Sequence, residues 1–343
     1  MSKIKKITRE KITIGIIGMG RIGNVHYKNL LRMPNIEIAY ICDIAAEEDW
    51  SSKYSQADKI VTDYHQVLAD KRVQAVLICV PTDLHPQFTI DAALAGKNIF
   101  CEKPVGFDDD AILKAYQTVQ ETGVKFQVGF NRRFDKNFRR IVDHREQGDL
   151  GTAHILKITS RDPEPPSMDY VKRSGGIFMD MTIHDFDMAR FITGEEVDSV
   201  FVAGGVLVDP AIGEAGDIDT ALTTLRFKNG MIGLIDNSRK AVYGYDQRIE
   251  LFGSAGMAHA DNVLDSTTTY SGSKTVMSDK PMFFFLQRYI DAYFSELGSF
   301  FEAVQGEHDI ECTFADGIYA IRLAQAAKKS LETGQPVKVA PIK

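Results

Sequence analysis

Two short motifs in this chain carry side chains suited to acid–base chemistry, and the first contains a lysine. Glu102-Lys103-Pro104 directly follows residues 98–101, which are predicted to form a strand. A lysine at a strand end can polarise an alcohol or carbonyl oxygen that lies within hydrogen-bond reach. Pro104 restricts Lys103 to extended geometry and permits a cis bond between the two residues, which would fix the direction of the ammonium group. The alternative is an ordinary solvated surface lysine.

The second motif spans residues 175–187 and contains a histidine between two aspartates. If a helix begins near Met179, then Asp180, His184 and Asp187 follow at i, i+4 and i+7 and share one face. A nearby carboxylate raises the pKa of an imidazole and orients its ring, as a general base near neutral pH requires. Two alternatives stay open: a core histidine with satisfied hydrogen bonds, and a metal site, although the His-Glu-x-x-His spacing is missing.

A glycine-rich turn near the start of the chain has the pattern of a dinucleotide site. The apolar run 12–17 leads into Gly18-x-Gly20-x-x-Gly23, and a second apolar run ends at Asp43, twenty positions after Gly23. The glycines permit a tight turn, close approach of a pyrophosphate and close helix packing, and an acid at that distance meets the adenosine ribose. Residues 44–48 offer two glutamates and no arginine for a 2′-phosphate, so the pattern favours NAD over NADP. A structural turn with a surface aspartate is the alternative.

Ligands of a doubly wound sheet bind outside the carboxyl ends of its strands, so the loops that follow the first, fourth and fifth strands are expected to face the cofactor. The residues expected to bind it are Gly18, Gly20, Arg21, Ile22, Gly23, Asp43, Pro81, Thr82, His85, Glu102 and Lys103.

Several polar residues beyond the sixth predicted strand are candidates for substrate binding. Asn131 and Arg132 lie at the predicted domain junction, a common place for a cleft. Arg132 could bind hydroxyls or anionic groups, or it could form an interdomain salt bridge. Asp162, at the end of a predicted strand, could bind sugar-like hydroxyls or begin a turn. Tyr245 is a weaker candidate of the same kind.

The elements that position these residues fall into two parts. Up to residue 130, apolar runs typical of strands alternate with helical patterns, which predicts an α/β domain with a doubly wound parallel sheet. The helices predicted there are 21–33, 45–55, 84–95 and 108–122.

From residue 131 onward, consecutive strands without intervening helices predict an α+β domain with a large, mostly antiparallel open sheet. The predicted domains are therefore 1–130 and 131–343, with the C-terminal helix able to pack back on the first. The strands predicted in the second domain are 152–159, 199–208, 220–227, 231–237, 248–252 and 263–270, and the helices are 135–147, 283–305 and 314–333.

The composition is that of a soluble globular protein that acts on a small molecule. The chain has 343 residues, of which 44% are hydrophobic and 25% charged. A net charge of −7 without a basic stripe argues against nucleic-acid binding. The basic N-terminus (Lys3, Lys5, Lys6 and Arg9) lacks a following apolar stretch, and no run is long enough to span a membrane. Widely spaced cysteines (Cys42, Cys79, Cys101 and Cys312) suggest free thiols, so we expect a cytoplasmic protein.

These motifs together resemble the family of glucose-fructose oxidoreductase and inositol dehydrogenase, the Gfo/Idh/MocA oxidoreductases. The resemblance covers essentially the whole chain, from the glycine turn through Glu102-Lys103-Pro104 to the motif over 175–187. The segments 129–135 and 177–191 are similar to the inositol 2-dehydrogenases in particular.

The resemblance implies that Lys103 and His184 are catalytic, and that Asp180 binds substrate hydroxyls and supports proton transfer. It implies that Asn131, Arg132 and Asp162 line the substrate pocket. NAD is the implied cofactor, a polyol the implied substrate, and a homotetramer packed through the second domain's sheet the implied assembly. Asn131 replaces a residue that is often apolar in myo-inositol enzymes, so myo- and scyllo-inositol are both candidates.

The activity implied is oxidation of a ring hydroxyl of an inositol to an inosose, without a metal ion. His184 would take the hydroxyl proton while Lys103 stabilises the developing alkoxide. A dehydrogenase of an aldose or another sugar derivative would use the same residues. A regulator that binds NAD without turnover is a third possibility, but it would need neither Lys103 nor the pair of Asp180 and His184.

Overall fold

The chain divides into two compact units, as the computed structural model of residues 10–342 describes them. Unit 1 comprises the chain up to Gly129 together with Tyr293–Phe314, and unit 2 comprises Phe130–Ala292 and the chain from Ala315 onward. The segment Tyr293–Phe314, which the sequence assigns to the second domain, thus belongs to unit 1. Within residues 10–342, no helix is long and apolar enough to cross a membrane. The basic residues Lys3, Lys5, Lys6 and Arg9 lie outside the described part of the chain.

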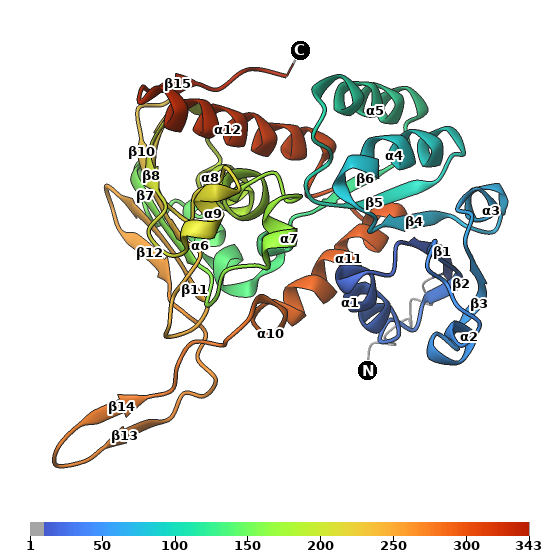
Figure 1. Ribbon diagram of the computed structural model, residues 1–343, viewed down its shortest axis with the longest axis horizontal. Coiled ribbons are helices and arrows are strands. Elements are labelled where there is room, and N and C mark those ends of the chain that lie inside the picture. The colour runs from blue at the N-terminus through green and yellow to red at the C-terminus, as the bar shows by residue number, and fades with distance from the viewer. Residues whose placement is uncertain (1–9, 343) are drawn as a thin grey trace, which may run out of the picture. The chain divides into compact units, whose positions relative to one another are not determined.

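Unit 1 is built on a six-stranded sheet in which every neighbouring pair is parallel (Figure 1). The strand order β3-β2-β1-β4-β5-β6 is that of a dinucleotide-binding fold, so the predicted doubly wound α/β domain is confirmed. The strands are β1 (Ile12–Ile17), β2 (Ile36–Cys42), β3 (Ala57–Val61), β4 (Ala75–Ile78), β5 (Asn98–Glu102) and β6 (Phe126–Gly129).

Helices and apolar side chains cover this sheet. Leu297 and Phe300 of α11 join β1 and β5 residues in one buried cluster, which explains why this late segment belongs to unit 1. The predicted helix 45–55 is mostly wrong, because Asp43 Oδ1 accepts a hydrogen bond from Ala45 N (2.8 Å) and a turn forms instead. The helices are α1 (Arg21–Leu30), α2 (Trp50–Lys53), α3 (His65–Ala69), α4 (His85–Leu94), α5 (Asp109–Thr122) and α11 (Ile290–Val304), with a 3₁₀ turn over Thr82–Leu84.

Unit 2 is built on a seven-stranded mixed sheet with the order β12-β11-β7-β10-β9-β8-β15. The pair of β7 and β10 is parallel and the other neighbours are antiparallel, so the predicted mostly antiparallel sheet is confirmed. The strands are β7 (Ala153–Arg161), β8 (Val197–Gly205), β9 (Thr220–Phe227), β10 (Ile232–Ser238), β11 (Asp246–Gly253), β12 (Met257–Ala260) and β15 (Val337–Lys338).

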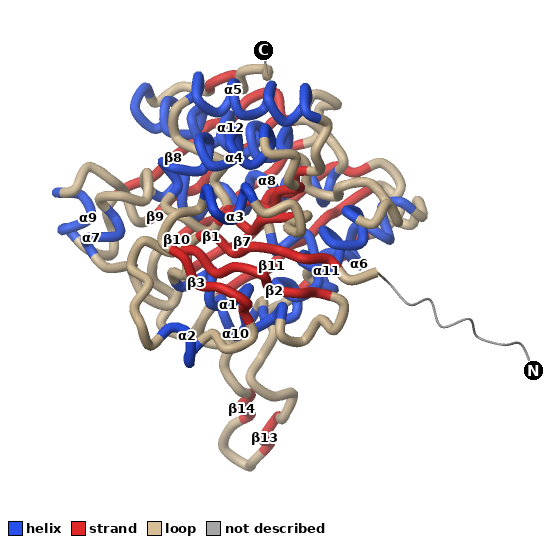
Figure 2. The backbone as a smooth tube through the Cα atoms, turned by 90° about the vertical axis from the view of Figure 1, so that its right-hand side faces the viewer, coloured by secondary structure: helices blue, strands red, loops and turns tan. Residues whose placement is uncertain are grey.

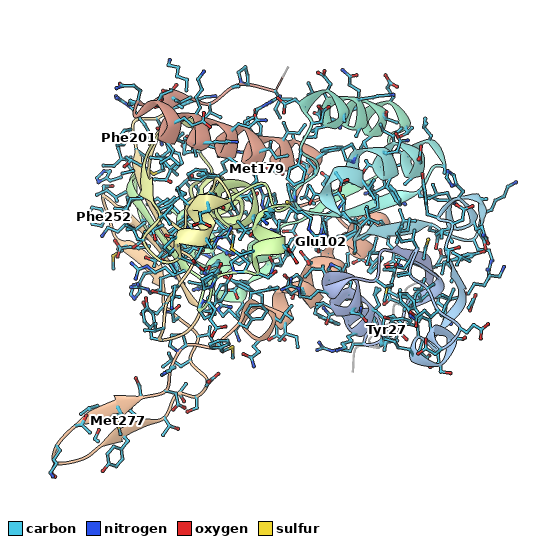
Figure 3. All side chains as sticks on the ribbon, viewed as in Figure 1. Tyr27, Glu102, Met179, Phe201, Phe252 and Met277 are labelled. Atoms are coloured by element: carbon cyan, nitrogen blue, oxygen red, sulfur yellow. The ribbon has the colours of Figure 1, made fainter. Side chains whose placement is uncertain are left out.

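The two faces of this sheet differ. Residues alternate between buried and exposed along β9 and β10, as a sheet covered on one side requires. Figure 3 shows Phe201 and Phe252 on the face that points away from the unit's helices. The helices of unit 2 are α6 (Lys136–Glu146), α7 (Met168–Val171), α8 (Ile183–Thr193), α9 (Pro210–Glu214), α10 (Phe285–Arg288) and α12 (Phe314–Thr333), with a 3₁₀ turn over Asn131–Phe134 and a π-helical turn over Phe178–Thr182.

The predicted strand 263–270 is wrong. The side chain of Asn262 accepts a hydrogen bond from Gln247 N (2.6 Å) and donates one to Asp246 (2.7 Å), and the chain leaves the sheet there. The following residues form a separate exposed hairpin, β13 (Thr269–Ser271) with β14 (Val276–Ser278), that projects from unit 2 in Figures 1 and 2. The predicted helix 283–305 is in fact two helices, α10 and α11, which are separated at Tyr289.

Candidate functional site

The glycine turn of unit 1 is packed so tightly that two of its positions exclude any side chain. Gly18 has a φ of +95°, and a Cβ there would lie 2.6 Å from the Cys79 carbonyl group at the end of β4. A Cβ at Gly23 would lie 2.1 Å from Gly18 O. At Gly20, by contrast, no described atom lies within 4 Å of such a Cβ. Backbone is therefore accessible at Gly20, where α1 begins and its unpaired N–H groups favour an anion.

Asp43 connects the end of β2 to this turn. Its Oδ2 accepts a hydrogen bond from Met19 N (2.7 Å), while its Oδ1 accepts one from Ala45 N (2.8 Å). Each carboxylate oxygen keeps a second lone pair for a ligand hydroxyl. Adjacent residues line a depression of about 430 Å³: Ala46, Glu47, Glu48, Ser51, Ile60, Val61, Thr62 and Gln66. Its two glutamates would repel a phosphate on the 2′ position of a ribose.

His85 links the loops that follow β4 and β5. Its Nδ1 lies 2.7 Å from Pro104 O and its Nε2 lies 2.9 Å from Val80 O, and the ring is buried. Burial lowers the pKa of His85, so the neutral ring donates to one of the two carbonyl groups. The bond between Lys103 and Pro104 is cis, as the sequence permits. His85 therefore connects the loop that contains Lys103 to the loop after β4, through the backbone carbonyl groups of Pro104 and Val80.

The predicted cofactor residues of unit 1 are thus gathered at the carboxyl ends of the strands. Arg21 and Pro81 are exposed, Ile22, Thr82 and Lys103 are partly exposed, and Glu102 is buried. The accessible backbone at Gly20, the helix start and the carboxylate of Asp43 fit the pyrophosphate and ribose of a dinucleotide.

In unit 2, the carboxylate of Asp180 is held from two sides. Tyr170 donates a hydrogen bond to its Oδ1 (2.7 Å), and Arg239 Nη1 donates one to its Oδ2 (2.9 Å). The same Nη1 lies 3.7 Å from Asp162 Oδ2. Burial raises the pKa of Asp162 to about 6; Arg239 opposes this shift, and Asp180 adds to it. Arg239 therefore bridges two aspartates, and both had been predicted as substrate ligands.

Arg239 is a site residue that the sequence interpretation missed. It is only 2% exposed, and its Nε and Nη2 have no hydrogen-bond partner among residues 10–342. No local sequence pattern marks it, because its place depends on the pairing of β7 with β10, which are parallel neighbours with Ser238 opposite Arg161. Parallel strands bring their carboxyl ends to the same sheet edge, so the residues that follow these two strands, Asp162 and Arg239, meet there.

His184 lies in the first turn of α8, directly after the π-helical turn. Its ring contacts the Phe130 ring edge to face, with centroids 5.8 Å apart. The prediction that Asp180, His184 and Asp187 share one face is wrong for Asp187. That residue is buried and pairs with Arg133 (Nη2 to Oδ1, 2.6 Å), so the ion pair draws it into the interior of unit 2.

Arg132 and Tyr245, both predicted substrate ligands, meet in a buried network. Arg132 Nη1 lies 2.6 Å from Asp185 Oδ1, and its Nη2 lies 3.2 Å from the Tyr245 hydroxyl. Asn237 donates a hydrogen bond to Asp185 Oδ2 (2.8 Å). Burial raises the pKa of Asp185, and the guanidinium of Arg132 opposes this shift. Asn131 is 2% exposed, and its Nδ2 has no partner in the described chain.

Comparison with known proteins identifies relatives along nearly the whole chain. The model of an oxidoreductase family with an NAD-binding Rossmann fold (GFO_IDH_MocA) matches residues 12–130, and that of the GFO/IDH/MocA C-terminal domain matches residues 138–259. The chain is 51% identical to the uncharacterized oxidoreductase YrbE of Bacillus subtilis over 96% of its own length and 97% of the relative. It is 46% identical to the myo-inositol 2-dehydrogenase of Thermotoga maritima over 95% of its own length and 98% of that relative.

A solved structure is also similar. The scyllo-inositol dehydrogenase of Lactobacillus casei, crystallised with bound NAD(H) and scyllo-inositol, superposes with a TM-score of 0.90 at 29% identity. The superposition covers 97% of this chain and 100% of that chain.

Proposed function

Because the chain belongs to the GFO/IDH/MocA family of NAD-binding oxidoreductases, we propose that it oxidises a ring hydroxyl of an inositol to the corresponding inosose. NAD is the cofactor. The observation that carries the choice of substrate is the fixed carboxylate of Asp180, which lies between Tyr170 and Arg239 and precedes His184 by four residues. The chain that carries this arrangement is 46% identical to a protein named myo-inositol 2-dehydrogenase.

The proposed catalytic residues are Lys103, Asp180 and His184. A ring nitrogen of His184 takes the proton of the reacting hydroxyl, and the ammonium of Lys103 stabilises the alkoxide that develops. Asp180 binds a substrate hydroxyl and supports the proton transfer. Bound NAD supplies the acceptor for the hydride that leaves the carbon. The glycine turn and Asp43 hold the diphosphate and the adenosine ribose.

The groups around Arg239 suit a neutral polyol. Asp162 and Asp180 accept hydrogen bonds, whereas Nε and Nη2 of Arg239, which have no partner among residues 10–342, can donate them. Each hydroxyl of a cyclitol can donate and accept, so it complements such a mixed set. A sugar acid would instead place its own charge beside two carboxylates. Asn131 also lines this proposed pocket, while Arg132 and Tyr245 position it from within their buried network.

The test is NADH production, followed by absorbance, with the purified protein, NAD and a substrate panel. The panel contains myo-inositol, scyllo-inositol, aldoses and sugar acids. We expect turnover with at least one inositol, at a kcat/KM well above that for any aldose. A higher kcat/KM for an aldose would overturn the choice of substrate. NAD binding without turnover of any compound would overturn the assignment as an enzyme.

The proposed assembly is a homotetramer packed through the open face of the unit 2 sheet. This face exposes large apolar side chains, as surfaces that mark protein interfaces do. They are Phe201, Leu222, Ile232, Leu234 and Phe252, each between 38% and 51% exposed. Light scattering should give four times the chain mass for the wild type and a smaller mass for Leu234→Glu. Leu94→Glu, at an exposed leucine of unit 1, is the control, and a monomeric wild type would contradict the proposal.

A further inference from the structure

Three ionisable side chains that the proposed reaction does not use meet in the interior of unit 1. His26 comes from α1, Glu102 from the end of β5 and Glu296 from α11, and their exposed fractions are 0%, 9% and 0%. One imidazole nitrogen and one oxygen of each carboxylate lie within 4.8 Å of one another. His26 Nε2 lies 2.7 Å from Glu102 Oε1, which is a hydrogen-bond distance. Figure 3 labels Glu102.

Among the residues that the structure describes, no positively charged group is found to act on the carboxylate of Glu296. Glu102 is the one described charged group that shifts the pKa of Glu296. Cys79 and Cys101 are neighbouring thiols whose pKa values are raised, chiefly by burial and further by Glu102. Two further ionisable neighbours are His85, whose pKa burial lowers, and Tyr293, whose ring centroid lies 5.9 Å from that of His26. Gln127, a neutral amide, donates a hydrogen bond to the backbone carbonyl group of Glu296 (2.9 Å).

An ionised Glu296 would be a poorly compensated charge. Both of its carboxylate oxygens are buried and have no hydrogen-bond partner within the described part of the chain. Burial of an unpaired carboxylate is so costly that such groups take up a proton instead. Burial raises the pKa of Glu296 well above its ordinary value, and the nearby Glu102 raises it further.

A bound metal ion is the alternative explanation for a cluster of one histidine and two glutamates. Ligands of a tetrahedral zinc ion at bond lengths of about 2.0–2.1 Å lie about 3.3 Å apart. The separation of 2.7 Å between His26 Nε2 and Glu102 Oε1 is too short for two such ligands and suits a shared proton. The geometry therefore favours protons over a cation.

We propose that Glu296 is a protonated, neutral carboxylic acid in the native protein, beside Glu102, which is held by its hydrogen bond with His26. Glu102 immediately precedes Lys103 in the chain. Glu296 thus acts as a positioning residue, because it keeps a second charge away from the segment of Lys103. Only this last consequence rests on the proposed function.

Infrared spectroscopy tests the proton directly. Near pH 7, exposed carboxyls are ionised, so the carbonyl stretching band of a carboxylic acid reports buried protonated groups. We expect such a band in the wild type and a decrease in Glu296→Gln, whose amide mimics the neutral acid. Asp162, Asp185 and Asp187 also have raised pKa values and can contribute to this band. The contribution of Glu296 is therefore assigned from the difference between the spectra of wild type and Glu296→Gln. Glu296→Met is the second variant if the glutamine variant does not fold. An unchanged band would overturn the proposal.

Thermal unfolding as a function of pH is the second test, and it is independent of activity. A raised native pKa gives stability that is present below the unfolded pKa of about 4.5 and is lost as pH rises through the native pKa. The Tm of Glu296→Gln relative to wild type should therefore rise between pH 4.5 and pH 8, by about 3 °C or more. The control, Glu121→Gln on the exposed surface of α5, should show no such rise.

Elemental analysis of the purified protein completes the test. We expect no stoichiometric transition metal in the wild type. One equivalent of zinc or another divalent metal per chain, lost in Glu296→Gln, would overturn the proposal, as would a Tm difference that stays constant across the pH range. If no inositol is turned over but the infrared band and the pH dependence are present, the proposed function fails and the protonated Glu296 stands.

Discussion

The guanidinium of Arg132 lies 2.6 Å from the carboxylate of Asp185, and both side chains are buried in unit 2. The next residue, Arg133, forms a second buried pair with Asp187 at 2.6 Å. Two consecutive arginines of the 3₁₀ turn after β6 thus hold two carboxylates of α8, the first of which directly follows His184. The proposed general base is positioned by this double ion pair.

Asp185→Asn should destabilise unit 2 strongly. Removing one partner of a buried ion pair leaves the other charge uncompensated, which costs about 3–5 kcal/mol of unfolding free energy. Chemical denaturation, followed by circular dichroism, measures this loss. Asp143→Asn is the matched control, because Asp143 forms an exposed pair with Arg140 at 3.4 Å. Equal stability of the two variants would show that the ion pair of Arg132 and Asp185 does not hold α8.

Asp43→Asn should weaken NAD binding and reduce the preference for NAD over NADP. The amide has one acceptor oxygen and can keep only one of the two hydrogen bonds from Met19 N and Ala45 N, and the charge that would face the ribose is lost. Hydrogen bonds to charged groups contribute about 1.5–3 kcal/mol, which corresponds to about a tenfold to hundredfold higher Kd. Titration calorimetry with both dinucleotides measures the effect.

The control for this experiment is Asp49→Asn, at an exposed residue before α2. It should bind NAD like the wild type. If Asp43→Asn also binds NAD like the wild type, the carboxylate does not contact the ribose.

Lys103→Met should lower kcat far more than it changes NAD binding. Loss of a positioned acid–base group reduces turnover by about 10²–10⁴-fold. Because the bound diphosphate is assigned to the glycine turn, the Kd for NAD should change much less. Steady-state kinetics with the best inositol and calorimetry with NAD separate the two quantities. Lys114→Met, on the exposed surface of α5, is the control, and near-normal turnover of Lys103→Met would remove Lys103 from the mechanism.

The dinucleotide half of the molecule could be predicted well from the sequence because its signals are local. Gly18 and Gly23 are required by contacts with backbone a few residues away or on the adjacent strand, and Asp43 ends the very next strand. The cis bond at Pro104 was also permitted by a single residue type. Such features are set by the local backbone conformation, which neighbouring residues of the sequence determine.

The polar site of unit 2 could be predicted only in part because it depends on long-range pairing. Arg239 reaches Asp180 across 59 residues, and only the parallel register of β7 and β10 brings it near Asp162. Asp187 points into the interior because Arg133, 54 residues earlier in the chain, pairs with it, and residue spacing gives no sign of that partner. Arg132 was expected at the substrate, but its partner Asp185 was hidden among three aspartates of one motif.

The stability of the protein should depend on pH near 6 through Asp162. Burial raises the pKa of this carboxyl from 3.8 to about 6, against the opposing effect of Arg239. A raised native pKa gives stability that is complete below pH 3.8 and is lost as pH rises through about 6. The Tm of Asp162→Asn relative to wild type should therefore rise between about pH 4 and pH 6 and level off above pH 7. Asp162 is 26% exposed, so the effect should be modest.

Arg239→Gln identifies the group that opposes this shift. Without the guanidinium, Asp162 should release its proton at a higher pH. When Asp162→Asn is compared with its parent in the Arg239→Gln background, the Tm difference should therefore reach its plateau at a higher pH. Asp169→Asn, an exposed aspartate of α7, should show no pH-dependent difference in Tm. If the Tm difference levels off at the same pH after Arg239 is replaced, burial alone sets the proton affinity of Asp162. Arg239 would then interact with Asp180 only.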